Sequence, residues 1–346
     1  MRQKGTRKSR ESDARDHRLI TIGETAPAFG GSRKLTEGQL RVVMGQAIRS
    51  WLGRTPSEFT RASYALDLHQ FLTFTGIDPV HLEELTRIRP EHVAAWRDDM
   101  QQRGSMNSTM RRKLTALRSL FSYLQVYGYL GANPAHSKFV KAPAVPRDGK
   151  TVGLSPADCR RLLDAPDSIT PAGVRDRAIL GVLAYSACRV GELVRLKVSD
   201  FKTHGEHRVL AVYGKGGKER TVPLHLEAVE RLAAWLELSG NRDDRDGPLF
   251  RPAMTPRGRG RDGFQRRHLT TRAVEHLVRR YTHELKLDAA VTVHSLRVTA
   301  LTTARERGAD IIDLQDFAGH SDPRTTLMYI RSRDRLSQSP AYVLRY

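Results

Sequence analysis

The sequence predicts a two-domain protein, in which an all-helical domain precedes a mixed α+β domain with a small antiparallel sheet. Three observations lead to this prediction. The chain has 346 residues, which is long for one domain and comfortable for two. Residues 35–133 show helical hydrophobic periodicity throughout. From Thr151 onward, short apolar runs of strand character stand among the helical ones.

The first domain is expected to span residues 35–134 as a small helical bundle. Pro56 stands at a plausible helix start, and apolar residues follow it at helical spacing. Two more helices are predicted, from about Pro90 to Gly104 and over residues 105–127. Asn133-Pro134 then ends the helical pattern, because proline and the residue before it disfavour helix.

Three other segments have no helical period. Residues 1–34 mix charges with glycine and serine, and we expect an arm that is either a solvated tail or a grip on DNA. Residues 135–150 combine prolines with basic residues, which is typical of an extended linker. Residues 336–346 form a C-terminal tail whose apolar end is expected to contact either a neighbouring subunit or its own domain.

The second domain is expected to span residues 151–335. Ser155-Pro156 opens a helix, and an apolar helix follows that is broken near Cys188. Residues 209–223 predict a hairpin, because two strand-like runs flank a glycine-rich tip. Further helices are predicted at 225–238, 270–286 and about 294–318.

The charge balance predicts a polyanionic partner. Lys and Arg number 58 against 38 Asp and Glu, a formal net charge of +20. Such an excess is typical of proteins that bind nucleic acid. Two cysteines cannot build a disulfide framework, and the chain has neither a long apolar run nor a signal-peptide pattern. We therefore expect a soluble, cytoplasmic protein that binds nucleic acid and does not associate with membranes.

Five short segments of the second domain each place a strongly polar residue beside apolar ones. They are CRVGEL (188–193), YGKGGKER (213–220), HSLR (294–297), AGHSD (318–322) and TTLMYI (325–330). Each alone has an ordinary structural explanation, such as an ion pair, a hairpin turn or a packed histidine. The glycine-rich segment is not a phosphate-binding P-loop, because Glu219 follows the lysine where Ser or Thr is required.

Together, the order and spacing of these segments resemble the tyrosine recombinase (phage integrase) family. In that family an Arg and an acid three residues later precede a hairpin Lys, a His-x-x-Arg, a Gly-His and a nucleophilic Tyr. Here His320 follows Arg297 by 23 residues and Tyr329 follows His320 by nine, as is usual in the family. The resemblance covers residues 151–330 and, more weakly, the helical domain. It implies a SAM-like core-binding domain and a tyrosine recombinase catalytic domain.

Metal-free cleavage of a DNA phosphodiester needs a nucleophile, a positive clamp on the phosphate and a proton for the leaving 5′ oxygen. Arg189 and Arg297 suit the clamp, because a guanidinium binds two phosphate oxygens in a fixed plane. The resemblance implies that Tyr329 attacks phosphorus and forms a 3′-phosphotyrosine.

The resemblance also assigns the supporting roles. Lys215 would protonate the leaving oxygen, with Lys218 as the alternative hairpin lysine. His294 would serve acid–base work, His320 would hydrogen-bond the phosphate, and Glu192 would orient Arg189 and His294. The rival nucleophiles Tyr342 and Tyr346 break the family spacing.

The sequence departs from the family pattern at two places. Val298 follows Arg297 where a second histidine is common, and Ala187-Cys188 replaces a more usual Gly-Leu or Gly-Met. Neither departure removes a group that the reaction needs.

No cofactor and no metal site is expected. His204 and His207 lack a third ligand at useful spacing, and the acidic pairs Asp98-Asp99 and Asp243-Asp244 lack the features of a two-metal nuclease.

A second group of basic residues is predicted to contact DNA from the helical domain and the linker. Its members are Arg111, Arg112, Lys113, Arg118, Lys138 and Lys141. The basic helix 105–127 is the first candidate for entering the major groove, and its structural alternative is a solvated charged face. The resemblance further implies a homotetramer on two DNA recombination sites in a bacterial or phage-type context. It says nothing of accessory DNA-bending proteins.

Two other functions stay open. A type IB topoisomerase would use the same chemistry but rejoin the original strand, and a non-catalytic regulator would only bind DNA. For a recombinase, the outcome could be integration, excision or transposition of a mobile element, or resolution of a replicon.

Overall fold

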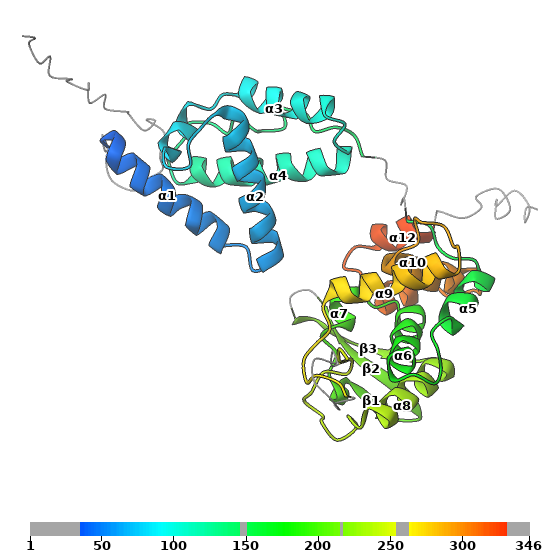
Figure 1. The fold of residues 1–346 in the computed structure, drawn as a ribbon. Helices are drawn as coiled ribbons and strands as arrows, with labels where there is room; N and C mark the ends of the chain where they lie inside the picture. Colours follow the sequence, from blue (N-terminus) through cyan, green and yellow to red (C-terminus); the bar gives the residue numbers. More distant parts are fainter. Residues whose placement is uncertain (1–34, 146–150, 215–216, 254–262, 331–346) are drawn as a thin grey trace, which may run out of the picture. The chain divides into compact units, whose positions relative to one another are not determined.

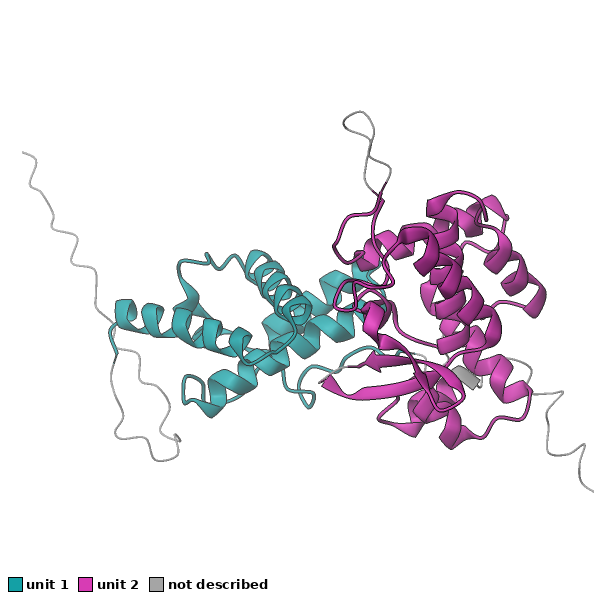
Figure 2. Cartoon of the chain, turned by 90° about the horizontal axis from the view of Figure 1, so that it is seen from below, with its two compact units in different colours: residues 1–145 teal, residues 146–346 magenta. Residues whose placement is uncertain are grey.

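The computed structural model describes residues 35–145, 151–214, 217–253 and 263–330, without the side chains of the last two residues. The chain divides into two compact units, residues 1–145 and 146–346, which Figure 2 shows in different colours. In these described ranges no helix combines the length and the apolar character that crossing a bilayer requires.

The first unit is helical in every described element (Figure 1). Its elements are α1 (Glu37–Gly53), α2 (Glu58–Thr75), the 3₁₀ helix η1 (Leu82–Arg87), α3 (Pro90–Gln102) and α4 (Asn107–Val126). Local chemistry sets the ends. The Thr36 side chain caps α1 in a reciprocal pair with Gln39, and α2 ends at Gly76, whose φ of 73° suits glycine. The three helices predicted from about Pro56, Pro90 and residue 105 are present.

Aromatic side chains from α2, α3 and α4 meet in the core of this unit. Phe71 packs edge-on against Trp96 at 5.2 Å and against Phe121 at 6.3 Å between ring centroids. Helix α4 adds leucines at helical spacing, of which Leu114 and Leu117 are fully buried. Burial of one such side chain contributes about 1.5–3 kcal/mol.

Part of the segment predicted as a linker packs on the helical unit instead. Ala135 and Val140 are fully buried in its core, and Arg118 donates hydrogen bonds to their two carbonyl oxygens at 2.9 and 2.6 Å. The compact unit therefore reaches Val145. Residues 146–150, the rest of the predicted linker, lie outside the described residues, as do the arm 1–34 and the tail 336–346.

The second unit combines helices with one three-stranded antiparallel sheet (Figure 1). Its helices are α5 (Pro156–Asp164), α6 (Pro171–Ser186), α7 (Val190–Leu193), η2 (Val198–Asp200), α8 (Leu226–Ser239), α9 (Thr271–Glu284), α10 (Val293–Glu306), α11 (Ile311–Ala318) and α12 (Pro323–Ile330). The strands β1 (Phe201–His204), β2 (His207–Tyr213) and β3 (Glu219–Pro223) lie in the order β1-β2-β3.

The hairpin prediction for residues 209–223 is confirmed by β2 and β3, which pair with Leu210 opposite Val222. Strand β1 was not predicted. The helical stretch predicted at about 294–318 is present as two helices, because α10 ends at Glu306 and α11 begins at Ile311. Gly308, with φ 96°, provides the turn between them, since that conformation is open mainly to glycine.

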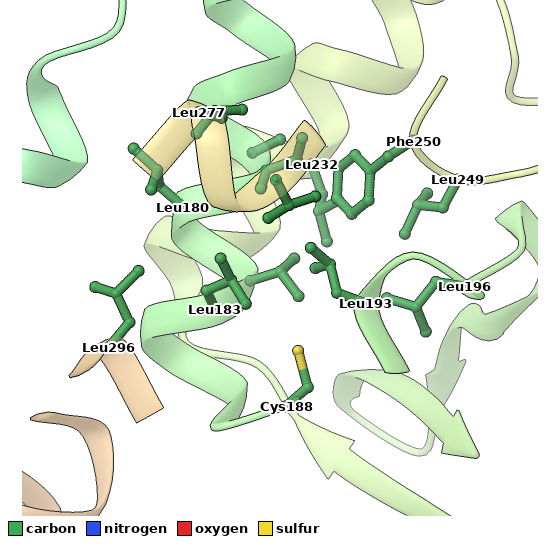
Figure 3. Close-up of a cluster of buried hydrophobic side chains, with 14 of the residues drawn as sticks. Leu180, Leu183, Cys188, Leu193, Leu196, Leu232, Leu249, Phe250, Leu277 and Leu296 are labelled. Atoms are coloured by element: carbon green, nitrogen blue, oxygen red, sulfur yellow. The ribbon is translucent and has the colours of Figure 1, made fainter. Parts of the chain in front are cut away.

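The core of the second unit surrounds α6 (Figure 3). Leu180 and Leu183 of α6 pack with Leu193 of α7 and Leu232 of α8. The Cys188 side chain belongs to the same buried cluster, directly before Arg189. The backbone of Arg189 is thus held by the hydrophobic core, while its side chain can reach solvent.

Candidate active site

Arg189 is held by the carboxylate of Glu192. Its backbone N–H donates to Glu192 Oε2 at 2.9 Å, and its Nη1 donates to Oε1 at 3.0 Å. The carboxylate is buried, whereas 44% of the Arg189 side chain is exposed. Burial alone would raise the pKa of Glu192, but hydrogen bonds from Arg220 and Arg189 hold it below its ordinary value. The acid therefore stays ionised and orients a guanidinium that remains accessible.

The conformation of Ala187 shows why glycine is more usual at this position in the family. It follows the last residue of α6 with φ 48°, a left-handed conformation that glycine adopts most easily. Its carbonyl oxygen accepts a hydrogen bond from Arg297 Nη1. At the other departure, Val298 is buried.

Arg297 on α10 is almost completely buried, at 2% exposure. Its Nη2 donates to the Ala318 carbonyl oxygen at 2.6 Å and to His320 Nε2 at 2.7 Å. A buried guanidinium needs several acceptors, and here they come from the end of α6 and from the end of α11. Arg297 therefore joins α10 to the end of α11 and to the end of α6, which lies 110 residues away in the chain.

The two ring nitrogens of His320 have different partners. Because a guanidinium can only donate, Nε2 must accept from Arg297, so the ring proton lies on Nδ1 and is donated to Thr326 Oγ1 at 2.8 Å. Burial, followed by the positive charges of Arg297, Arg189 and Arg220, lowers the pKa of His320 to about 4. His320 is neutral at pH 7.

His294 stands at the start of α10, one turn before Arg297. Desolvation lowers its pKa first, followed by the charges of Arg297 and Arg189. The positive charges of Arg189 and Arg297 therefore lower the pKa values of both histidines. The structure brings four of the predicted site residues into one electrostatic neighbourhood.

The predicted nucleophile lies on an adjacent helix. Tyr329 belongs to α12, which packs against α10 and α11 (Figure 1), but its side chain is outside the described part of the chain. Thr326 precedes it by almost one helical turn and is fully buried against His320. The hydrogen bond between Thr326 and His320 therefore anchors the helix that carries Tyr329.

Lys215 also lies outside the described residues, between β2 and β3. Gly214, the residue before it, lies close to the acid, since a Cβ there would be 3.8 Å from Glu192 Oε1. The alternative Lys218 is exposed. The base of the hairpin is thus beside Glu192, and the choice between the two lysines stays a prediction.

Arg220 and Thr326 belong to the site, and both were missed by the sequence reasoning, although each lies in a segment that it singled out. Arg220 Nη2 donates to Glu192 Oε2 at 2.8 Å. A signal for Arg220 was present: it precedes the buried Val222 by two residues, which places both side chains on the same face of β3.

The residues predicted to bind DNA differ in their surroundings. Arg112 forms a two-pronged ion pair with Asp67, whose side chain is completely buried. Arg118 is committed to two backbone carbonyls, and the Lys113 ammonium lies 5.7 Å from the centroid of the Trp96 ring. The members of the set that are exposed without such a contact to an acid or ring are Arg111, Lys138 and Lys141.

No group of three or more His, Cys, Asp and Glu that could hold a metal ion occurs among the residues that the structure describes. In the same ranges, Asp244 forms ion pairs with Arg251 and Arg266.

The site brings together two arginines, two histidines and the helix that carries a tyrosine. Such a set of side chains is suited to phosphoryl transfer, because cations bind the phosphate and a hydroxyl can attack it. The chain matches two family profiles. Residues 153–335 match the phage integrase family, and residues 51–126 match the N-terminal SAM-like domain of phage integrases.

Curated relatives give the same result. The tyrosine recombinase XerC of Pelobacter propionicus is 33% identical over 290 residues, which are 82% of this chain and 89% of that protein. The tyrosine recombinase XerD of Pseudomonas aeruginosa is 32% identical over 283 residues, 81% of this chain and 88% of that protein. The chain therefore belongs to the phage integrase family, as a site-specific tyrosine recombinase.

Solved structures share the fold. A lambda integrase (75–356) dimer bound to a COC′ core site has a TM-score of 0.65 and 18% identity, over 84% of this chain and 95% of that chain. The XerH site-specific recombinase bound to palindromic difH substrate, in a post-cleavage complex, has a TM-score of 0.61 and 17% identity, over 90% of this chain and 95% of that chain.

Proposed function

We propose that this recombinase cleaves and rejoins double-stranded DNA through a covalent 3′-phosphotyrosine on Tyr329. The Tyr329 oxygen forms a bond to phosphorus as the bond to the 5′ oxygen breaks. His294 accepts the tyrosine proton, and Lys215 gives a proton to the leaving oxygen. The 5′ hydroxyl of a partner duplex then attacks the phosphotyrosine, which reverses the step and releases Tyr329.

Arg189 and Arg297 bind the non-bridging oxygens in this proposal. His320 supports the clamp, because its Nε2 accepts a hydrogen bond from Arg297, and it could donate to the phosphate itself only with its proton on Nε2. Their attraction grows as negative charge accumulates around phosphorus, so they stabilise the transition state more than the bound DNA. A tyrosine hydroxyl has a pKa of about 10, and nearby cations favour its ionised form.

One observation carries the proposal: Arg297 on α10 donates hydrogen bonds to His320 Nε2 at 2.7 Å and to the carbonyl oxygen of Ala187, two residues before Arg189, so the predicted phosphate-binding residues meet at one centre. The lowered pKa values of His294 and His320, to which both arginines contribute, agree with this arrangement. The hydrogen bond from His320 to Thr326 on the Tyr329 helix supports the choice of nucleophile.

The experiment uses nicked duplexes drawn from the DNA that flanks the gene, incubated with the full chain and with EDTA. After denaturation, the native protein should remain attached to DNA, and a digest should place the link on Tyr329. The variant Tyr329→Phe should form no adduct, while the matched controls Tyr342→Phe and Tyr346→Phe should form it normally. An undiminished adduct from Tyr329→Phe would reject the assignment.

We further propose that Arg111, Lys138 and Lys141 contact DNA phosphates. Exposed cations release counterions from DNA on binding, so affinity should fall steeply with salt. Replacing one of them by Met should reduce that slope by about one.

A homotetramer on two DNA sites follows from strand exchange, since four strands must be cut. Native mass spectrometry of the protein with two duplexes would measure it. A plasmid with two sites should yield recombinant circles, as expected for a mobile element or replicon, whereas a type IB topoisomerase would only relax it and a regulator would leave it unchanged.

A further inference from the structure

Arg220 contacts two segments of the proposed active site although it is not one of the predicted catalytic residues. It lies on β3, and 13% of its side chain is exposed. Its Nη2 donates to Glu192 Oε2 at 2.8 Å, and its Nε donates to the carbonyl oxygen of Phe317 at 3.3 Å. One guanidinium thus links the hairpin to α7 and to the end of α11.

The contact with Glu192 changes the charge that Arg189 can offer. Glu192 is buried and accepts hydrogen bonds from both arginines. With Arg220 present, two guanidiniums face one carboxylate and a net positive charge remains. Without Arg220, Glu192 and Arg189 would form a neutral pair, and the attraction between Arg189 and a phosphate would weaken because the carboxylate opposes it.

The second contact lies next to His320. Phe317 is in the last turn of α11, where carbonyl oxygens lack helical partners and carry the negative end of the helix dipole. Gly319, with φ 61°, gives the guanidinium its space, since a Cβ there would be 2.9 Å from Arg220 Nη1. Arg220 therefore packs against the residue that directly precedes His320.

We propose that Arg220 is a positioning residue for strand cleavage, acting through Glu192 on Arg189 and through the end of α11 on His320. Because Arg220 lies on the hairpin, Arg189 and Arg297 can bind the phosphate correctly only when the hairpin is in place. This inference rests on the proposed function of the site.

The first test compares Arg220→Met with Arg208→Met. Arg208 lies on the neighbouring strand β2, where it donates to Thr203 Oγ1 at 2.9 Å and covers the Phe201 ring. Both variants lose one guanidinium from the same sheet. With saturating protein on nicked duplex, Arg220→Met should cleave about 10- to 100-fold more slowly, because a small displacement of a catalytic group has that effect. Its DNA affinity should change less than about threefold, and Arg208→Met should cleave at the native rate.

The second test removes the charge of Glu192, the partner of Arg220. In a Glu192→Gln background the buried charge is gone, so adding Arg220→Met should slow cleavage by only about threefold, the share of the α11 contact. This background also removes the risk that a buried carboxylate with one partner fewer destabilises the protein. Arg220→Lys should recover part of the rate, since an ammonium can reach Glu192 but offers no planar fork for a second acceptor.

The outcomes separate the inference from the proposed function. Failure of the native protein to form an adduct would remove both. If the native protein cleaves and Arg220→Met cleaves equally fast, the positioning role is wrong while the function stands. An equal loss from Arg220→Met in the native and Glu192→Gln backgrounds would reject action through Glu192.

Discussion

The buried neutral His320 should make the catalytic unit sensitive to mild acid. Its pKa is lowered from 6.5 to about 4, first by burial and then by three arginines. An unfolded chain would bind this proton near pH 6.5, while the folded chain would resist it. The stability from His320 is therefore complete above about pH 6.5 and is lost as the pH falls towards 4.

The size of the effect follows from the two pKa values. At pH 5 nearly all unfolded molecules would carry the proton and few folded ones would, which lowers the free energy of unfolding by about 2 kcal/mol relative to pH 7. Other titrating groups also respond to pH. The variant His320→Gln keeps those groups and removes only the one in question.

The assay is urea unfolding of both full-length proteins at pH 7 and pH 5, followed by hydrogen exchange of α10, which reports on the second unit alone. The native protein should lose about 2 kcal/mol more than His320→Gln between the two pH values. Equal losses in the two proteins would refute the buried neutral state of His320.

Two further predictions concern buried polar contacts. Arg112→Met should lower the unfolding free energy of the helical unit by about 3–5 kcal/mol, because it leaves the buried Asp67 carboxylate unpaired. Arg111→Met should leave that energy unchanged in the same urea titration and should weaken DNA binding. Thr326→Val should cost about 1–3 kcal/mol because His320 Nδ1–H loses its acceptor, and Thr326→Ser should restore most of it. A nitrogen NMR spectrum that places the native ring proton on Nε2 would contradict the second prediction.

Much of the fold could be predicted from local patterns. Helix α4 follows from apolar residues such as Leu114 and Leu117 at helical spacing, and the β2–β3 hairpin follows from strand-like runs around a glycine-rich tip. The order and spacing of five short segments, including the intervals between Arg297, His320 and Tyr329, indicated the family, because helices and short turns of defined length hold these residues in place. The break at Gly308 was missed, since apolar residues on both sides continue a helical rhythm.

Only the tertiary structure decided what each basic residue does. Arg111 and Arg112 are neighbours of the same charge, yet Arg112 meets Asp67, which lies 45 positions away, and Arg220 meets Phe317 at a separation of 97. The sequence does not distinguish an arginine that faces solvent from one that binds a phosphate or pairs with a buried carboxylate. The difference arises when distant segments pack, because burial makes an unpaired charge costly and so selects the partner.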